Sequence, residues 1–515
     1  MLAATTSFGL LLALGGMLQA APFTAAPGPA VRFGVHELAF TGNGGAADPF
    51  AMAATVTVTP PSGIRRTVEM FWDGGNSWRA RVYVTETGAW SWASSCADDP
   101  GLNGKTGSFR AGESSLRGLL KSHPANPRAL ATDNGRWFVP IGDTAYFLLG
   151  SSNYLDYVRD DWARGVNFLR CSAFGQLRHY DSHFDADGRP NLAALQSEDA
   201  KLKSLFNQYP GVYLQYILFP ENASNKWASF STTAKTEWLQ QAVARFGAFP
   251  TITWQIMNDS AYPAANTGDT AVAETVAAFL VAHDGYGHLR GTGARRGKGA
   301  PFADRPWTTF LHHETKDALA ADEADRPAAP GKFTWCGEDR YETYLPPAHP
   351  RYFFRRLMWA WILSGGSACY GGDWDTTTPY TLTGFAGLDS IAFIGSYFES
   401  RGIDLALFSY NDKLARDPAA TAKSRPQACN RGGEEFIVYH PNGTGDGAGV
   451  DVDAGRTASF ELNLTGASGP FRVEWLRAQD GVSISGGLVQ GGALRTFTAP
   501  WAGQDVVCRL ERSGP

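Results

Sequence analysis

Short apolar runs alternate with helical stretches along the middle of this 515-residue chain, and this alternation constrains the fold more than any other feature. The candidate strands are Trp137–Ile141, Val166–Cys171, Val212–Phe219, Thr251–Met257, Trp307–Leu311, Phe333–Cys336 and Ser367–Tyr370, with an eighth near His288–Gly291. Helical stretches such as Glu237–Phe246, Thr270–His283 and Tyr352–Leu363 lie between them. Residues 128–402 therefore have the size and rhythm of a (β/α)8 barrel, an α/β fold. A doubly wound sheet is the alternative, but no candidate strand is followed by a GxGxxG dinucleotide loop.

The regions on both sides of this segment are predicted to be all-β. In residues 31–112, Trp78, Ala80 and Val82 alternate with Arg79 and Arg81, which is the period of a half-buried strand. Residues 404–515 show the same alternation. We expect a β-sandwich in each region, so that the chain is multidomain with a central barrel flanked by two sandwiches. Residues 121–127 are predicted to be a linker.

The first charged residue is Arg32, and it follows an apolar run at residues 8–14 and a series of small residues. This pattern predicts a signal peptide within residues 1–27 and a secreted or periplasmic protein. No other stretch reaches the ~18 apolar residues of a membrane span. Because the formal net charge is −5, a nucleic-acid partner is also not expected.

Six cysteines are too few to form a disulfide framework in so long a chain. Cys429 and Cys508 could pair, and the other four are expected to be buried thiols. No CxxC motif or Cys/His cluster has the spacing of a zinc site. We therefore predict no metal and no cofactor.

Two acidic residues stand out among the polar residues that follow the candidate strands. Asp259 closes the fourth strand and Glu338 closes the seventh, so both would lie at the end of a barrel where active sites are built. Cleavage of a glycosidic bond needs one carboxylic acid and one ionised carboxylate on either side of the sugar. The alternative is structural: Asp259 would cap a helix, and Glu338 would pair with Arg340 on the surface.

The central segment resembles the apiosidase-like glycoside hydrolases. The motifs that carry this resemblance are Ile141-Gly142-Asp143-Thr144-Ala145-Tyr146, Trp254-Gln255-Ile256-Met257-Asn258-Asp259, Gly337-Glu338-Asp339-Arg340-Tyr341-Glu342 and Tyr370-Gly371. The resemblance implies a (β/α)8 barrel between an N-terminal β-sandwich and a C-terminal sandwich of the collagen-binding type. It also implies that Asp259 is the acid/base, that Glu338 is the nucleophile and that Asp143 lies at the sugar-binding floor.

The chain departs from the family pattern at three places. Met257-Asn258 replaces two glycines, Tyr146 replaces a Trp, and Asp339 replaces a Pro. These changes concern contacts with the sugar ring, so they bear on the substrate more than on the reaction class.

Further residues near the predicted strand ends are candidates for substrate binding, each with a structural alternative. Arg170 would hold Glu338 ionised, or else form a surface ion pair. Asn258 would bind a sugar hydroxyl, or else form a helix-entry turn. The remaining candidates are His312 (or its neighbour His313), Trp335, Tyr341, Glu342 and Trp374, with a structural role as the alternative for the histidines and a core position as the alternative for the tryptophans.

The sequence thus predicts an exported glycoside hydrolase that acts on a plant or microbial polysaccharide or glycan. A retaining mechanism is expected, with the carboxyl groups of Asp259 and Glu338 about 5–6 Å apart. The competing interpretation is a catalytically retired barrel that binds carbohydrate or serves as a scaffold. The sequence does not predict the sugar, the linkage or the oligomeric state.

Overall fold

The computed structural model describes residues 21–173, 184–185, 188–219, 229–259, 267–293, 296–297, 299–300, 302–315, 331–373, 384–421, 424–445 and 449–514. Its centre is a sheet of parallel strands in the order β16-β15-β14-β13-β12-β19-β18-β17. These strands are β12 (Gly142–Thr144), β13 (Phe168–Ser172), β14 (Tyr213–Phe219), β15 (Ile252–Met257), β16 (Arg290–Gly291), β17 (Phe310–Glu314), β18 (Phe333–Glu338) and β19 (Gly366–Tyr370). The Thr309 amide donates to the Arg290 carbonyl at 2.8 Å, which joins the two ends of the sheet. The sheet is therefore barrel-like.

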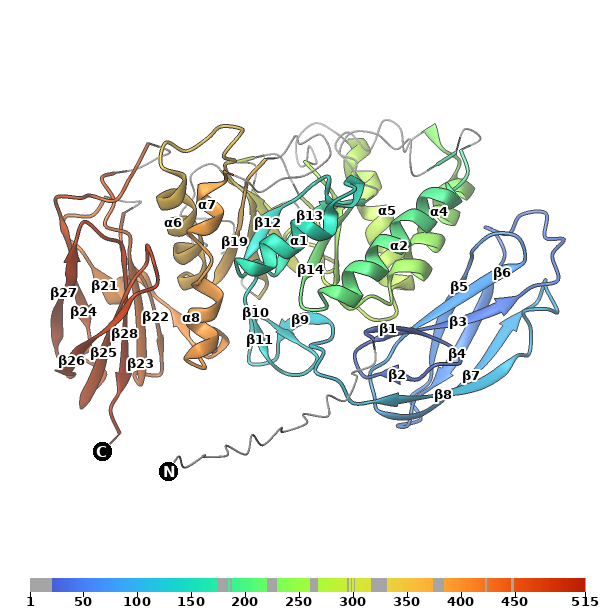
Figure 1. Ribbon diagram of the computed structural model, residues 1–515, viewed down its shortest axis with the longest axis horizontal. Helices are drawn as coiled ribbons and strands as arrows, with labels where there is room; N and C mark the ends of the chain where they lie inside the picture. The colour runs from blue at the N-terminus through green and yellow to red at the C-terminus, as the bar shows by residue number, and fades with distance from the viewer. Residues whose placement is uncertain are drawn as a thin grey trace, which may run out of the picture.

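Helices surround this sheet in the order that the sequence predicts (Figure 1). They are α1 (Tyr154–Ala163), α2 (Leu192–Gln208), α4 (Thr232–Phe246), α5 (Thr267–His283), α6 (Pro350–Leu363), α7 (Ala386–Asp389) and α8 (Ile394–Ser400), with the 3-10 turn η1 (Leu148–Gly150). Every residue of β13 and β14 is buried, as expected for parallel strands covered on both faces. Asn191 and Ser231 accept a backbone hydrogen bond at the starts of α2 and α4, which explains where these helices begin.

Two details of the predicted barrel are wrong. The first barrel strand is β12 and not Trp137–Ile141, because Pro140 lacks the N–H that a ladder needs and separates β12 from β11 (Trp137–Phe138). The predicted linker instead contains parts of strands β9 (Leu120–His123) and β10 (Asn126–Thr132). Together with β11, these strands form a small antiparallel sheet. Figure 1 shows this sheet beneath the barrel-like sheet.

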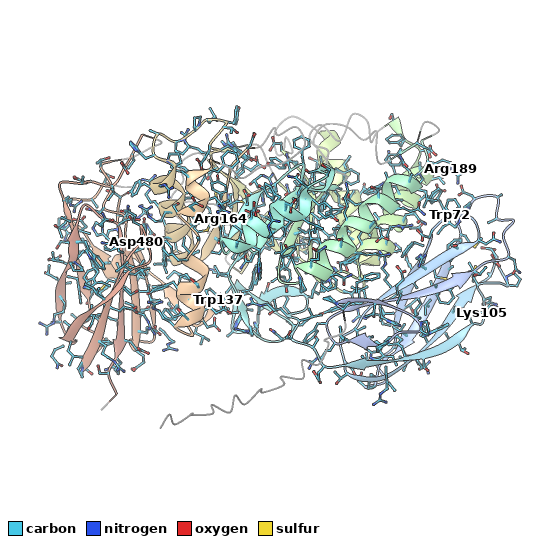
Figure 2. All side chains as sticks on the ribbon, viewed as in Figure 1. Trp72, Lys105, Trp137, Arg164, Arg189 and Asp480 are labelled. Carbon is cyan, nitrogen blue, oxygen red and sulfur yellow. The ribbon has the colours of Figure 1, made fainter. Side chains whose placement is uncertain are left out.

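The N-terminal region forms a continuous eight-stranded sheet in the order β1-β3-β6-β5-β4-β7-β8-β2. Its strands are β1 (Phe23–Ala25), β2 (Ala30–Val31), β3 (Val35–Thr41), β4 (Ala54–Thr59), β5 (Arg66–Trp72), β6 (Ser77–Tyr83), β7 (Gly88–Cys96) and β8 (Thr106–Gly112). In Figure 2, Trp72 of this sheet lies near Arg189. Phe50 links them, since its ring meets Trp72 edge-on and Arg189 lies 5.5 Å from its centroid. This contact joins the sheet to the segment before α2.

The C-terminal region contains a six-stranded sheet, β20-β22-β23-β28-β25-β26, and a three-stranded sheet, β21-β24-β27. Its elements are η5 (Leu405–Leu407), β20 (Ser409–Tyr410), η6 (Asp412–Leu414), β21 (Ala415–Arg416), β22 (Gln427–Arg431), β23 (Glu435–His440), β24 (Thr457–Asn463), β25 (Pro470–Arg477), β26 (Ser483–Gln490), β27 (Leu494–Ala502) and β28 (Val506–Arg512). Both sheets contribute to one apolar cluster, to which Phe460 and Trp475 belong. All six cysteines are buried free thiols, including Cys429 and Cys508. The helices of the described residues are each too short or too polar to cross a bilayer.

A buried ion pair connects α6 to the C-terminal sheets. The Arg355 guanidinium donates to both carboxylate oxygens of Asp505 at 2.8 Å, and Tyr439 donates to the same carboxylate at 3.1 Å. Both charged side chains are nearly inaccessible to water. The ion pair therefore fixes the position of α6 relative to the C-terminal sheets, at the cost of desolvating both charges.

Removal of one partner of this pair should destabilise the whole chain. In Asp505→Ala the Arg355 guanidinium remains buried without its counter-charge, and we expect the free energy of unfolding to fall by about 3–5 kcal/mol. The double variant Arg355→Met/Asp505→Leu removes both charges and should recover most of that loss. Urea denaturation of the three proteins measures the difference. If the single and double variants were equally destabilised, loss of packing and not an unpaired charge would be the cause.

Candidate active site

Three carboxyl groups meet where the central strands end. Asp259 follows β15, Glu314 ends β17 and Glu338 ends β18. One oxygen from each lies within 4.8 Å of one oxygen from each of the others. The structure thus brings Asp259 and Glu338 together as the sequence predicts, and it adds Glu314, which the sequence analysis missed.

Arg170 on β13 holds these strand ends together. Its guanidinium donates to Glu314 and to Glu338, each at 2.8 Å, and also bonds the Asn258 side-chain oxygen. Its Nε donates to the Gln255 oxygen at 3.1 Å. The Arg170 side chain is inaccessible to solvent, so the alternative of a surface ion pair is wrong. Five donors in a fixed fork can bind several acceptors at once, which a lysine cannot do.

Glu338 accepts hydrogen bonds from three side chains. Besides Arg170, Arg296 donates to its Oε1 at 2.7 Å, and the Tyr146 hydroxyl donates to its Oε2. An ionised carboxylate only accepts hydrogen bonds, so this set of donors fits the charged form of Glu338. Arg296 lies in the basic, glycine-rich stretch after β16, which resembles a solvated loop in sequence. Its position became visible only in the structure.

Glu314 lies deeper than the other two carboxyl groups. Its side chain is 2% exposed, and burial, followed by the nearby charges of Asp259 and Glu338, raises the pKa of Glu314 well above its ordinary value. An oxygen of Asp259 lies within 4.8 Å of an oxygen of Glu314, yet the buried Oδ1 of Asp259 has no donor among the described residues. Two adjacent carboxyl groups satisfy each other only if a proton lies between them.

Asp259 also has an unusual backbone conformation. Its φ is +41°, in the left-handed region that residues other than glycine seldom adopt. Such strain costs about 1–3 kcal/mol and is concentrated at functional sites. Here it turns the chain sharply after β15, and Asp259 keeps partial exposure while Asn258 beside it is buried.

His312 and Trp335 belong to the barrel interior. Trp335 donates to Gln215 at 2.9 Å, Gln215 in turn contacts His312 Nδ1 at 2.9 Å, and His312 Nε2 lies 3.4 Å from Glu314. Both rings are about 1% exposed. The predictions that they contact substrate are therefore wrong, because the interior of an eight-stranded barrel is filled by side-chain layers. Burial and the charge of Arg170 lower the pKa of His312 well below its ordinary value, so this ring is neutral.

Asp143 and Glu342 point away from the carboxyl cluster. Gly142 and Thr144 face Trp335 and the Gly337 carbonyl inside the barrel, so Asp143 between them faces outward, where Tyr157 of α1 donates to it. Burial raises the pKa of Asp143 to about 7. Glu342 accepts hydrogen bonds from Tyr370 and from two backbone amides at the start of α7. Neither residue is placed to bind substrate, contrary to prediction.

The remaining candidates divide in the same way. Tyr341 is 1% exposed and packs with Tyr146 and Ile217, a core position that contradicts its predicted contact with substrate. Asn258 lies beside Asp259, and Arg170 fixes the orientation of its amide. Trp374 lies outside the described residues.

Residues 30–97 match a family model described as a domain of unknown function, DUF5060. No curated protein matches the sequence. The chain has the fold of a protein from Bacteroides vulgatus ATCC 8482 that is described as a candidate glycoside hydrolase. The TM-score is 0.71 at 17% identity, over 95% of this chain and 100% of the other.

Two further solved structures are similar over a smaller part of the chain. One is named a glycoside hydrolase, with a TM-score of 0.59 at 15% identity, over 77% of this chain and 97% of the other. The second is a glycoside hydrolase family 5 protein from Bacteroides vulgatus ATCC 8482, with a TM-score of 0.59 at 14% identity, over 77% and 93%. At these identities the likeness establishes a shared fold, with a barrel-like sheet in a multidomain chain.

Gly337, directly before Glu338, provides a test of this arrangement. A Cβ at this position would lie 1.9 Å from His312 Cε1 and 2.7 Å from Trp335 Nε1. Gly337→Ala should therefore displace the end of β18, cost at least about 1–3 kcal/mol of stability and misplace Glu338. Gly112→Ala in β8 is the control, because its Cβ would meet no atom within 4 Å. Thermal denaturation compares them, and equal melting temperatures would refute the close packing described for His312.

Proposed function

We propose that this protein is a retaining glycoside hydrolase of the apiosidase-like type, with Asp259 as acid/base and Glu338 as nucleophile. The observation that carries the proposal is the close approach of these carboxyl groups, with oxygens within 4.8 Å. Retaining enzymes place the pair about 5–5.5 Å apart, whereas inverting enzymes need about 6.5–9.5 Å to admit a water. The likeness to glycoside hydrolase folds supports the same reaction class.

The hydrogen bonds suit the role of each group. Glu338 would attack the anomeric carbon as an ionised carboxylate, and its three donors orient it while leaving it partly exposed, at 14%. Asp259 is the more accessible member of the second carboxyl pair, and it would protonate the leaving oxygen. It would then remove a proton from the water that hydrolyses the glycosyl–Glu338 ester. Arg170 holds the side-chain amide of Asn258, which directly precedes Asp259 in the chain.

We further propose that the central sheet is a (β/α)8 barrel and that the flanking regions are accessory β-sandwiches without a catalytic carboxylate. The two-sheet arrangement around one apolar core supports a sandwich in the C-terminal region. In the N-terminal region the strands of the continuous sheet share one apolar cluster, which supports a sheet that folds over its own core. Export by a signal peptide remains part of the proposal, on the basis of the sequence pattern, with cleavage before β1 because Phe23–Ala25 pairs with β3 in the folded sheet. A plant or microbial polysaccharide or glycan is the proposed substrate class.

A retired, carbohydrate-binding barrel is less consistent with these contacts. Carbohydrate binding alone does not need a partly exposed carboxylate that is held by three donors, as Glu338 is, next to the carboxyl groups of Asp259 and Glu314. The strain at Asp259 would also be an unexplained cost in a scaffold. A screen of released sugars on plant and microbial polysaccharides identifies the substrate.

Two substitutions then separate the roles of the two carboxyl groups. Glu338→Gln keeps the shape but removes the nucleophile, so turnover should fall by several orders of magnitude on every substrate. Asp259→Asn removes the transferable proton, so it should cost about 10²–10⁴-fold on a natural glycoside. It should cost far less at the glycosylation step of a nitrophenyl glycoside, whose leaving group departs without a proton. The measurement is the rate of each variant on the matched pair of substrates.

The control for Glu338→Gln is Glu435→Gln in the C-terminal sheet. Glu435 is also a buried carboxylate bound to arginines, at 2.6 Å from Arg509 and 2.9 Å from Arg431. Its variant should be destabilised without loss of turnover. Equal losses on both substrates for Asp259→Asn would show that another group is the acid.

A further inference from the structure

Glu314 has contacts that the proposed roles of Asp259 and Glu338 leave unexplained. It is almost fully buried, so it cannot meet a substrate directly, yet an oxygen of Glu314 lies within 4.8 Å of an oxygen of each reacting carboxyl group. It shares Arg170 with Glu338, since each accepts from a different nitrogen of the guanidinium at 2.8 Å. Burial of a carboxyl group beside two others costs folding free energy, so a functional role for Glu314 is expected.

The charges of the cluster set the number of protons that it holds. Among the described residues, three carboxyl groups, those of Asp259, Glu314 and Glu338, face two guanidinium groups, those of Arg170 and Arg296. The buried Asp339 lies outside this set and accepts from the Thr315 hydroxyl at 2.7 Å. His312 is neutral, and Tyr146 contributes a hydroxyl donor. The charges of these five described groups are therefore balanced when one proton is bound. Because three donors serve Glu338, the proton belongs to the other two carboxyl groups.

We propose that Glu314 is a positioning residue that shares the catalytic proton with Asp259 and keeps Asp259 in the acid form before glycosidic cleavage. This inference rests on the proposed function, because it assigns the source of the proton that the reaction consumes. The orphaned Oδ1 of Asp259 and the approach of an Asp259 oxygen to within 4.8 Å of a Glu314 oxygen carry the geometry. When Glu314 is ionised, its charge favours protonated Asp259, and when Asp259 is ionised, Glu314 takes the proton.

The proton balance closes over the reaction cycle. In glycosylation, Glu338 forms the bond to the anomeric carbon, the glycosidic C–O bond breaks, and the proton leaves with the departing oxygen. Glu338 is now a neutral ester, so the two ionised carboxylates again balance the two guanidinium groups. Loss of the Glu338 charge also weakens proton binding by the pair, which leaves Asp259 as a base. Water then forms a bond to the anomeric carbon, the ester bond to Glu338 breaks and leaves its carboxylate ionised, and the proton of the water passes to the pair, which restores the starting state.

The test is the pH dependence of kcat/KM for Glu314→Gln. The amide keeps the shape but removes both the charge and the shared proton, so Asp259 should lose its proton at lower pH. On an unactivated glycoside, the alkaline limb of the pH profile of kcat/KM should shift to lower pH by about one pH unit or more. On a nitrophenyl glycoside, whose cleavage needs no proton, Glu314→Gln should leave the pH dependence of kcat/KM unchanged. A rate that falls equally at every pH, without movement of the limb, would overturn the proposal.

Two further variants distinguish this role from a structural one. Glu314→Asp keeps a carboxyl group and should restore the limb toward its wild-type position, even if kcat is reduced. Glu198→Gln removes another buried carboxyl group, which accepts from Tyr216 at 2.9 Å outside the cluster. It should change stability and leave the limb unmoved. If Glu198→Gln moved the limb as far as Glu314→Gln, the effect would be nonspecific and the proposal would fail.

A measurement without substrate separates this inference from the proposed function. Infrared difference spectra between acid and alkaline pH detect the carbonyl band of a protonated carboxyl group in the free protein. If the proton is shared, both Glu314→Gln and Asp259→Asn should remove or shift the same band. Loss of the band in Asp259→Asn alone would overturn the sharing, even in an active enzyme. A shared band in a protein that cleaves no glycoside would refute the proposed function and leave the shared proton established.

Discussion

The guanidinium of Arg170 is the contact on which the arrangement of the site depends. It extends from β13 and binds groups on β15, β17 and β18, so it connects its own strand to three others of the central sheet. Its side chain is fully buried, and within the described part of the chain the carboxylates of Glu314 and Glu338 balance its charge. Removal of one member of a buried ionic group of this kind costs about 3–5 kcal/mol. Stability and the geometry of the site thus rest on the same side chain.

The same contact explains why the carboxyl groups can lie so close together. Unscreened carboxylates in a buried site repel one another strongly, and one of them then takes up a proton. Arg170 and Arg296 offset two of the three charges, which leaves the cluster with a single proton to hold. A retaining mechanism needs one acid and one charged nucleophile. Inverting enzymes also use one acid and one ionised carboxylate, so the balance of charges supports glycosidic cleavage, and the spacing of the two residues supports retention.

The sequence predicted the parts of this structure that depend on pattern. Buried strand runs and helical stretches revealed the alternation, and the ends of β15 and β18 revealed Asp259 and Glu338. It did not reveal Glu314, because His312-His313-Glu314 has the appearance of an ordinary polar strand end. Arg296 lies in a glycine-rich loop whose return to the site has no local signal. These contacts depend on how distant segments meet, which periodicity does not record.

Other predicted substrate contacts were wrong because residues at a strand end can face either the interior of the sheet or the surrounding helices. Asp143 and Glu342 occur in motifs that suggest a site, but each points between the sheet and its helices. Trp335 faces inward, where the ring fills the barrel instead of meeting a sugar. The register of β12 decides the first case, because Gly142 and Thr144 face inward and Asp143 between them therefore faces the helices. One residue of slip exchanges the two faces of a strand.

The identity of the nucleophile is the central claim, and a trapped intermediate tests it most directly. A fluorinated glycoside of the sugar found by screening, with a good leaving group, forms the glycosyl-enzyme faster than water removes it. Digestion and mass spectrometry then locate the label. We predict one sugar per chain, attached to the peptide that contains Glu338, at the side chain of that residue. A label on Asp259 or Glu314, or turnover with inversion and no trapped sugar, would contradict the account.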